Sequence, residues 1–244
     1  MTKNMKKSYI LLSLAALLAL ACTKTNSEHQ GHEYVDLGLS IKWATYNIGA
    51  AKPEEAGDYF AWGEAETYYV AGDALAVEAT WKAGKSAGYN WESYKWSDNK
   101  GTVLHKYVTD SKYGTVDNKS VLEMADDAAR AAWGGKWRMP TREEWQELRD
   151  NCSWVWTSQG GVAGYSVTSK INGESIFLPA VGHRFSTQIY DSRMPDYADY
   201  GKYWTASLTS GQPCYADCWD VTPSNSSFGN AWRYLGLPVR PGVE

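Results

Sequence analysis

The stretch Trp133-Gly-Gly-Lys-Trp-Arg-Met-Pro-Thr-Arg-Glu-Glu-Trp-Gln-Glu-Leu-Arg-Asp-Asn-Cys152 carries the clearest helix start in the sequence. Thr141 and Glu144 have the spacing of a capping box, in which each side chain accepts a hydrogen bond from a free N–H of the first turn. Beyond them, Trp145, Leu148 and Cys152 share one helical face at i, i+3, i+7 spacing. We therefore predict a helix after Pro140, with Cys152 as a buried core thiol rather than a reactive one.

A second helix is predicted directly upstream of this stretch. Ser120 and Glu123 have the spacing of another capping box. Residues 124–133 are rich in Ala and other helix formers, and the glycine pair at 134–135 supplies a stop. In this interpretation the acidic pair Asp126-Asp127 lies on a solvated face and is not a general acid/base pair.

Strand patterns flank the two predicted helices. Upstream, period-two alternation or bounding glycines mark short strands at 34–37, 41–46 and 57–63. Downstream, residues 165–178 read as a hairpin, with Asn172-Gly173 predicting a type I′ turn. Three further strand candidates are 203–208, 214–221 and 235–240. Because strands precede and follow the helices without βαβ alternation, we predict an α+β domain with two helices packed beside antiparallel sheets.

Between the first strands and the helices, residues 64–118 show little sustained periodicity. The segment is rich in Gly, Ser, Asn and Lys, with scattered aromatic residues and one candidate strand at 103–108. We interpret it as a long excursion on the domain surface. A stretch of this length without regular structure is usually functional or mobile.

The composition excludes some classes of function. A net charge of −4 and a pI near 5.6, without a Lys/Arg stripe, argue against a nucleic-acid partner. Thirteen Trp and 17 Tyr stand against only four Phe. Trp and Tyr combine an apolar face with a hydrogen-bonding tip, which suits surfaces that both pack and grip. We expect more than half of them to be half-buried under long loops.

The N-terminus predicts export and lipid anchoring. Three lysines precede the apolar run 10–21, which is too short for a membrane span and fits a secretory signal. Ala21 stands before Cys22, so we predict a lipoprotein signal at 1–22 with Cys22 lipidated; an ordinary signal peptide with a chance cysteine is the alternative. Residues 23–32 read as a polar tether and 33–244 as a single domain. The expected location is the outer membrane, on its periplasmic face or the cell surface.

Several motifs in order resemble the Fibrobacter succinogenes major paralogous domain over essentially the whole mature chain. They are Tyr34-Val-Asp-Leu-Gly-Leu-Ser-Ile-Lys-Trp-Ala-Thr, Gly57-Asp-Tyr-Phe-Ala-Trp-Gly-Glu, the 133–145 stretch quoted above, Gly164-Tyr-Ser-Val-Thr-Ser, Gly201-Lys-Tyr-Trp and Leu237-Pro-Val-Arg-Pro. Such domains occur on exported lipoproteins of gut anaerobes of the Bacteroides type. The resemblance implies a C-type-lectin-like fold, in the branch that includes the formylglycine-generating enzyme.

Neither the resemblance nor the residues predict catalysis. The formylglycine-generating enzyme binds copper through a C-terminal cysteine pair. Cys214 and Cys218 lie upstream of that place and would stand about 13 Å apart on an extended strand. The calcium-lectin motifs, the G-x-S-x-G elbow, the phosphate loop and His-Glu-x-x-His do not occur. His105 and His183 have no carboxylate or thiol at ligand spacing, so we expect no enzyme activity, no metal and no cofactor.

The remaining three cysteines are also informative. With Cys22 lipidated, Cys152, Cys214 and Cys218 are an odd number, so they do not form a disulfide framework.

The C-terminal third has the composition of a binding face. Alternation along 214–221 places Tyr215, Asp217 and Trp219 on one side of a strand. Rigid aromatic anchors mixed with Ser, Asn and Asp are typical of binding surfaces. Trp204 and Trp232 are equally compatible with a place in the core. The predicted ligand-binding residues are Tyr215, Asp217, Trp219, Asn225, Ser226, Asn230, Trp232 and Tyr234.

We therefore expect a non-catalytic envelope lipoprotein that binds a glycan or a protein through this face. The alternatives are a structural envelope or fimbria-like component and, with least support, a copper-dependent oxidase. In some lectin-like proteins of this branch the same region is diversified by a retroelement, and the Tyr, Asn, Ser, Asp and Cys residues here fit that origin.

Overall fold

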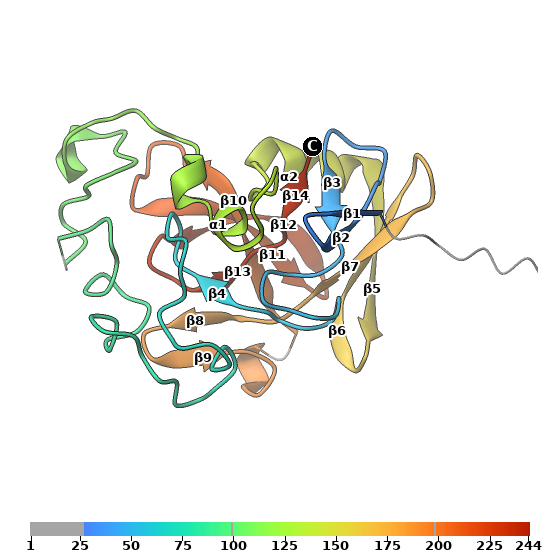
Figure 1. Ribbon diagram of the computed structural model, residues 1–244, viewed down its shortest axis with the longest axis horizontal. Coiled ribbons are helices and arrows are strands. Elements are labelled where there is room, and N and C mark those ends of the chain that lie inside the picture. Colours follow the sequence, from blue (N-terminus) through green and yellow to red (C-terminus); the bar gives the residue numbers. More distant parts are fainter. Residues whose placement is uncertain (1–26, 99, 198) are drawn as a thin grey trace, which may run out of the picture.

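The computed structural model describes residues 27–98, 100–197 and 199–244 (Figure 1). The predicted signal segment, including Cys22, lies outside the described residues. Within the part of the chain that the structure describes, no helix is long and apolar enough to cross a membrane.

The helix predicted after Pro140 is confirmed. Helix α2 (Arg142–Asn151) begins with a full capping box, in which the Glu144 N–H donates to Thr141 Oγ1 at 3.3 Å and the Thr141 N–H donates to Glu144 Oε2 at 2.8 Å. Trp145 and Leu148 are fully buried, and Cys152, the first residue of the following strand, is buried beside them. The helix therefore stands where its local sequence places it.

The upstream helix is shorter than predicted. Helix α1 (Ala128–Trp133) follows a 3-10 turn, η2 (Met124–Asp126), and its cap is Asp127, whose carboxylate accepts from the N–H groups of Ala129 and Arg130. The capping box expected at Ser120 is wrong. The Ser120 carbonyl instead accepts a hydrogen bond from the Leu208 N–H at 2.7 Å, which ties this segment to a distant strand in an extended form.

The interpretation of the acidic pair as a solvated face is also wrong. Asp126 and Asp127 are 5% and 1% exposed. Asp126 accepts hydrogen bonds from Lys106 and Tyr107, while Asp127 accepts from the Met139 N–H in addition to capping α1. Both carboxylates join separate chain segments and are therefore part of the fold.

The sheets are all antiparallel, which confirms a sheet-rich α+β class with two α-helices. Two three-stranded sheets dominate: β5 (Cys152–Gln159), β6 (Val162–Ser169) and β7 (Ser175–Pro179), and then β10 (Gly201–Leu208), β11 (Tyr215–Thr222) and β12 (Asn225–Trp232). Helix α2 contacts both β5 and the β10–β11 pair. We call β10–β11–β12 the C-terminal sheet.

The smaller sheets join the two ends of the domain. They are β1 (Ser27–His29), β2 (His32–Val35), β3 (Lys42–Ala44) with β14 (Gly242–Val243); β4 (Tyr59–Phe60) with β13 (Leu237–Pro238); and β8 (His183–Phe185) with β9 (Gln188–Tyr190). Because β3 pairs with β14 and β4 with β13, the last strands of the chain close the domain onto its first strands. A third 3-10 turn, η3, spans Pro195–Tyr197.

The end of the segment predicted as a tether is part of the domain. β1 and β2 form a hairpin in which Ser27 lies opposite Tyr34. His29 fixes this hairpin to the body, because its Nε2 accepts from the Lys136 N–H at 2.9 Å and its carbonyl accepts from Trp137 Nε1 at 2.8 Å. His32 stacks on Trp133 with ring centroids 4.0 Å apart. Residues 27–32, which the expected boundary assigned to the tether, are thus part of the domain.

The predicted β6–β7 hairpin is confirmed, but its turn is not type I′. That turn requires positive φ at two successive residues. Among residues 170–173 only Gly173 has positive φ, at 78°. Asn172 instead uses its side-chain oxygen to accept from the Glu174 N–H at 3.0 Å. The connection is a longer loop closed by side-chain hydrogen bonds.

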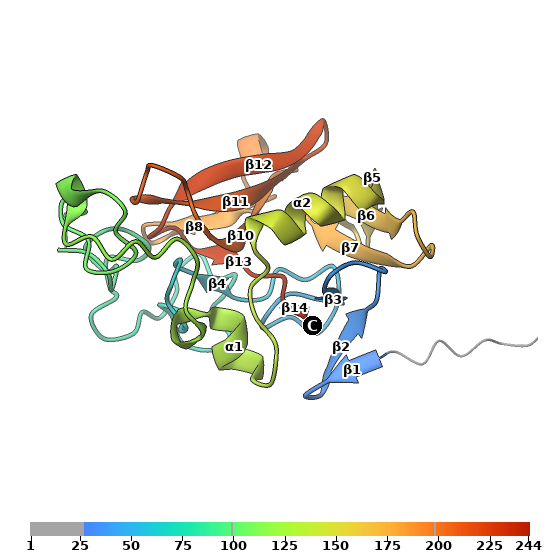
Figure 2. The same ribbon diagram turned by 90° about the horizontal axis from the view of Figure 1, so that it is seen from above.

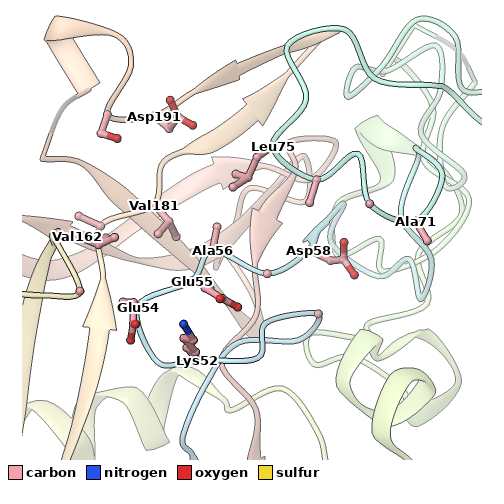
Figure 3. A pocket seen from close by; sticks show the side chains of 17 residues that line it. Lys52, Glu54, Glu55, Ala56, Asp58, Ala71, Leu75, Val162, Val181 and Asp191 are labelled. Atoms are coloured by element: carbon pink, nitrogen blue, oxygen red, sulfur yellow. The ribbon is translucent and has the colours of Figure 1, made fainter.

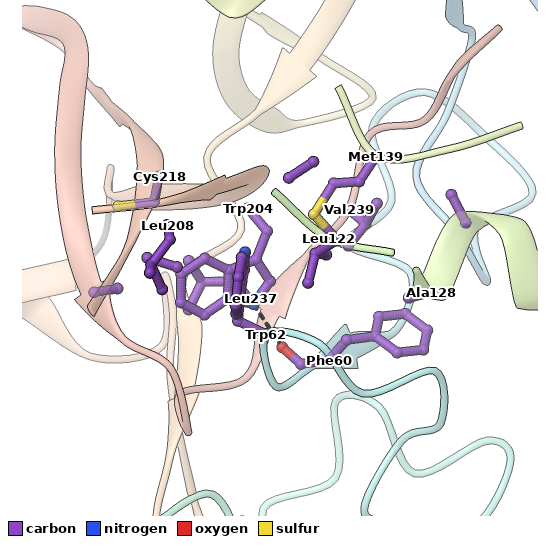
Figure 4. Packing of buried hydrophobic residues seen from close by; sticks show 14 of the residues in the cluster. Phe60, Trp62, Leu122, Ala128, Met139, Trp204, Leu208, Cys218, Leu237 and Val239 are labelled. Carbon is purple, nitrogen blue, oxygen red and sulfur yellow. Dashed lines mark hydrogen bonds between the residues drawn. The ribbon is translucent and has the colours of Figure 1, made fainter. Parts of the chain in front are cut away.

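The core lies beneath the C-terminal sheet (Figures 2 and 4). Trp62 and Trp204 are fully buried there, and each indole N–H has a backbone partner: Trp204 Nε1 donates to the Phe60 carbonyl at 2.7 Å and Trp62 Nε1 to the Thr205 carbonyl at 2.9 Å. A second cluster fills the space between α2 and the sheets around Trp43, Trp145 and Trp219.

The excursion at 64–118 occupies one end of the molecule (Figure 1, teal to green). Its described residues form no strand or α-helix, only the 3-10 turn η1 (Ser111–Tyr113) and isolated bridges, so the strand expected at 103–108 is absent. Its aromatic side chains nevertheless build a core of their own. Tyr68, Tyr69 and Tyr89 are fully buried and Tyr94 is 2% exposed.

The excess of Tyr and Trp over Phe has a structural explanation in this region. Irregular backbone leaves carbonyls without strand or helix partners, and buried polar groups need a hydrogen bond. The Tyr94 hydroxyl donates to the Trp62 carbonyl at 2.7 Å, and Trp96 Nε1 donates to the Gly63 carbonyl at 2.8 Å. The polar groups of many aromatic side chains therefore form hydrogen bonds with the protein's own backbone rather than with a ligand.

Two buried arginines from the C-terminal part of the chain act in the same way. Arg184 donates to the carbonyls of Asp73, Ala74 and Ala76. Arg233 donates to the carbonyls of Lys106, Tyr107 and Pro213 and to the Tyr94 hydroxyl. Both side chains are 0% exposed. They fasten the excursion to the rest of the domain.

Candidate ligand-binding site

The register of the C-terminal sheet decides which predicted site residues lie together. β11 and β12 pair so that Tyr215 lies opposite Trp232, Asp217 opposite Asn230, and Trp219 opposite Phe228. Directly opposite residues share one face of an antiparallel sheet. The other face carries Ala216, Cys218 and Ala231 into the core. The predicted strand alternation is therefore confirmed, with both faces packed for part of their length.

At one end of this face five rings form a cluster that is open in part, which we call the aromatic surface: Trp91, Phe185, Tyr215, Trp232 and Tyr234. Tyr234, predicted as a ligand contact, is buried at 9% exposure because Trp91, Phe185 and Trp232 pack around its ring. The Tyr215 and Trp232 rings are 4.0 Å apart at 31°, and Tyr234 lies parallel to Trp232 at 6.1 Å. Trp91 packs edge-on against Trp232 at 5.7 Å. Trp232 and Phe185 are 37% and 40% exposed. Apolar surface of this kind is available to a partner.

At the other end, α2 covers the face. Trp219 is fully buried, stacked on Trp145 at 5.6 Å and 15° and packed against Trp154 and Phe228. Its indole N–H donates to Ser226 Oγ at 3.0 Å. The expectation that Trp219 faces a ligand is thus corrected: it is a core residue because the helix lies over it, and Ser226 is occupied as its partner.

Between these two ends lies a charged pair. Asp217 is 5% exposed and accepts hydrogen bonds from Arg142 Nη1 and from Thr209 Oγ1, each at 2.8 Å. The Arg142 guanidinium also lies over the Phe228 ring at 3.9 Å from its centroid. Asn230, opposite Asp217, is exposed. Arg142 begins α2, so the helix delivers a cation to the centre of the predicted face.

A cavity of about 590 Å³ opens beside this pair. It is formed by the start of α2, the end of β10 and the following loop, with neighbouring loop residues. We call it the hydroxyl cavity, because most of its polar side chains are hydroxyls. Its lining residues are Thr109, Ser120, Val121, Arg142, Glu143, Ser207, Leu208, Thr209, Ser210, Gly211 and Asp217.

Not every predicted residue joins this site. Asn225 lies at the β11–β12 turn, where its side chain donates to Ser227 Oγ at 2.8 Å and its N–H donates to Thr222 Oγ1 at 3.2 Å. Trp232 lies seven residues further along β12, roughly 23 Å away at the usual strand rise. The two ends of the predicted set therefore do not meet.

Sequence reasoning missed Arg142, Thr209, Trp91 and Phe185. All four come from segments outside the strand pair that carries the pattern, so no local spacing marks them. The capping box does place Arg142 on the first turn of the helix, but not over a particular strand. Only the tertiary packing of α2 against β11 brings it to Asp217.

A second cavity, of about 820 Å³, lies between the excursion and the main body (Figure 3). Its carboxylates already have partners: Glu55 accepts from the Ala51 N–H at 2.8 Å, and Asp191 is paired with Arg193 at 2.7 Å. Burial raises the pKa of Asp58, which also accepts a hydrogen bond from Tyr69. Across the described residues no group of His, Cys, Asp and Glu has the geometry of a metal site.

The cysteines of the C-terminal sheet are buried as free thiols. Cys214 and Cys218 are 6% and 0% exposed, and neither is in a disulfide. Burial raises the pKa of each thiol, and Asp220 beside Cys218 acts in the same direction while Lys202 opposes it. A neutral, buried thiol is a poor nucleophile and a poor metal ligand.

No family model, curated protein or solved structure matches this chain. The resemblance drawn from the sequence motifs stays a prediction.

Proposed function

We propose that this chain is a non-catalytic, lipid-anchored envelope protein with a C-type-lectin-like domain, and that it binds a glycan or a protein. The observation that carries the proposal is the exposed Trp232 ring stacked with the half-buried Tyr215, near the hydroxyl cavity. Half-exposed rings on a regular sheet lose little conformational entropy when a ligand packs on them. Hydrogen-bonding groups next to an apolar platform supply orientation and specificity.

The exposure of Trp232 is the strongest part of this argument. The chain buries six tryptophans almost completely, so the fold has ample means of covering indole rings. Trp232 stays 37% exposed, with Phe185 at 40% in the same group. Clustered exposed aromatic rings are typical of interaction sites.

Three observations support the lectin-like assignment. The domain is α+β, its two chain ends pair through β3 and β14, and the capping box within the 133–145 motif is formed. The predicted residues that stay at least partly open, Tyr215, Asn230 and Trp232, come from β11 and β12, and the resemblance implies a ligand face in this region.

The proposal is tested with a glycan array and an envelope pull-down using the mature domain. Trp232→Ala and Tyr215→Ala should each weaken binding at least tenfold. Tyr34→Ala is the matched control, because Tyr34 is a partly exposed aromatic residue on a different sheet. Equal binding by all three variants and the unmodified protein would reject the aromatic surface as the site.

One observation favours a structural role as the second candidate. β12 is an edge strand that pairs only with β11, and Asn225–Trp232 contains no charged residue. Edge strands without charges or bulges favour addition of another strand. Recovery of the protein in a large envelope assembly, with no ligand on the array, would support this role over binding.

A further inference from the structure

We propose that the hydroxyl cavity binds one uncharged, polyhydroxylated ring, such as a pyranose unit of a glycan, through Arg142 and Asp217. This inference rests on the proposed binding function and names the ligand chemistry at one part of the site. The cavity's volume of about 590 Å³ lies within the usual range for small-ligand sites, about 300–1,000 Å³.

The charges around the cavity favour a neutral ligand. Arg142 is the only cationic residue in the lining, and its charge is already balanced by Asp217 at 2.8 Å. Glu143 adds an exposed carboxylate to the same wall. A carboxylate or phosphate ligand would therefore meet a net negative environment.

The hydrogen-bonding groups fit vicinal hydroxyls, each of which both donates and accepts. Arg142 makes one side-chain hydrogen bond to the described residues, from Nη1 to Asp217, which leaves Nε and Nη2 available as donors. A carboxylate can accept about four hydrogen bonds, whereas Asp217 accepts one from Arg142 and one from Thr209 through its side chain. Donor and acceptor therefore stand side by side.

The pair is held in place before any ligand arrives. Thr209 fixes one Asp217 oxygen, and Phe228 supports the face of the guanidinium at 3.9 Å. The Arg142 N–H donates to Ser207 Oγ at 3.0 Å, which fixes the start of the helix against β10. Preorganised groups of this kind bind without a large ordering cost.

The cavity and the aromatic surface belong to one face. Tyr215 and Asp217 are two residues apart on the same side of β11, roughly 6.6 Å along the strand. A ring bound at Asp217 would thus continue into a second ring that packs on Tyr215 and Trp232. Such an arrangement gives an oligosaccharide a polar subsite and a stacking subsite.

The test is calorimetric titration of the mature domain with neutral methyl pyranosides and their disaccharides, beside methyl glucuronide and inorganic phosphate. We expect the neutral probes to bind and the anionic probes to bind at least tenfold more weakly. Arg142→Gln and Thr209→Val should each reduce affinity for neutral probes at least fivefold. Arg149→Gln is the matched control, an exposed arginine seven residues along the same helix.

Thermal melts of each variant check folding, because Arg142→Gln leaves the buried Asp217 without its cation. Thr209→Val keeps that ion pair and removes a neutral hydroxyl that lines the cavity and donates to Asp217. Preference for the anionic probes, unchanged affinity in both cavity variants, or no binding of any neutral probe would overturn the cavity assignment. If array ligands still depend on Trp232 in that case, the proposed function stands; if they do not, both fail.

Discussion

The excursion and the C-terminal sheet satisfy their backbone hydrogen-bonding groups in opposite ways. In the sheet, β11 pairs with β10 on one side and with β12 on the other, so these backbone groups need no side-chain partners and side chains such as Trp232 can face outward. In the excursion the backbone is irregular, and side chains supply the missing hydrogen bonds. Tyr94 and Trp96 do so by donating to backbone carbonyls. The aromatic residues of the excursion are therefore structural, whereas part of those on the C-terminal sheet is available to a ligand.

This difference explains why composition alone misleads about function. A high content of Tyr and Trp is expected in binding surfaces. Here 9 of the 30 Trp and Tyr residues lie in the excursion, a region of more than 50 residues whose described part has no strand or α-helix. Function has to be sought where backbone hydrogen bonds are already complete and an aromatic side chain still stays exposed.

The largest effect should come from Trp219, and it contrasts with Trp232 on the same sheet. Trp219→Ala should lower the free energy of unfolding by about 4 kcal/mol, because it removes a fully buried ring and leaves a cavity. Trp232→Ala should lower it by less than about 1 kcal/mol, since its ring is partly exposed. Urea denaturation of both variants measures the contrast. Similar losses in the two would show that the sheet does not divide into a core end and a free end.

Arg233→Met tests whether the excursion depends on its arginine. The change keeps bulk but leaves the carbonyls of Lys106, Tyr107 and Pro213 without their donor, so we expect a loss of about 3 kcal/mol. Limited proteolysis should then cut within 64–118 first. Arg149→Met is the control, because Arg149 is exposed and should change stability little. Cleavage in the C-terminal sheet instead would contradict the assigned role.

Removing a single hydroxyl from the excursion should cost less. Tyr94→Phe leaves the Trp62 carbonyl and Arg233 Nε without a partner, and we expect a loss of about 1–2 kcal/mol by urea denaturation. Tyr113→Phe is the matched control in the same segment, because its hydroxyl makes no hydrogen bond to the described residues. Equal stability of the two variants would show that tyrosine hydroxyls do not stabilise the irregular backbone of the excursion.

The last test concerns acid. Burial and the nearby Lys202 lower the pKa of His183 to about 4, from the ordinary 6.5. The unfolded chain therefore takes up a proton on His183 before the folded protein does, so stability present above pH 6.5 is lost as pH falls toward 4. His183→Gln should flatten this part of the stability profile, measured by thermal melts. An unchanged slope in the variant would assign the acid response to other groups.

The sequence predicted what local spacing controls. The Thr141–Glu144 capping box and the buried face of α2 need only residues within two turns, and both are present. Ser120 carries the same signal and fails, because pairing with Leu208, 88 residues away, holds it extended. Local propensity is outweighed wherever a tertiary partner offers the same hydrogen bonds.

The candidate site shows the same limit. Strand alternation correctly grouped Tyr215, Asp217 and Trp219 on one face. It does not indicate that α2 covers Trp219 or that Arg142 of α2 pairs with Asp217. Arg142 and Trp91 enter from distant segments, and nothing in their own surroundings marks them. The residues that share this face of β11 were predictable from the sequence, but which of them stay exposed to solvent was not.

The attachment of the β1–β2 hairpin to the domain has a consequence for where the domain would stand. If Cys22 carries a lipid, only residues 23–26 separate it from β1, and the Cys22 to Ser27 Cα distance is at most about 18 Å. The hairpin β1–β2 lies on the opposite side of the molecule from β12 (Figure 2). The domain would rest against the lipid headgroups with its aromatic surface turned outward. Its reach above the bilayer would then be set by its own thickness, so it would sample ligands close to the membrane.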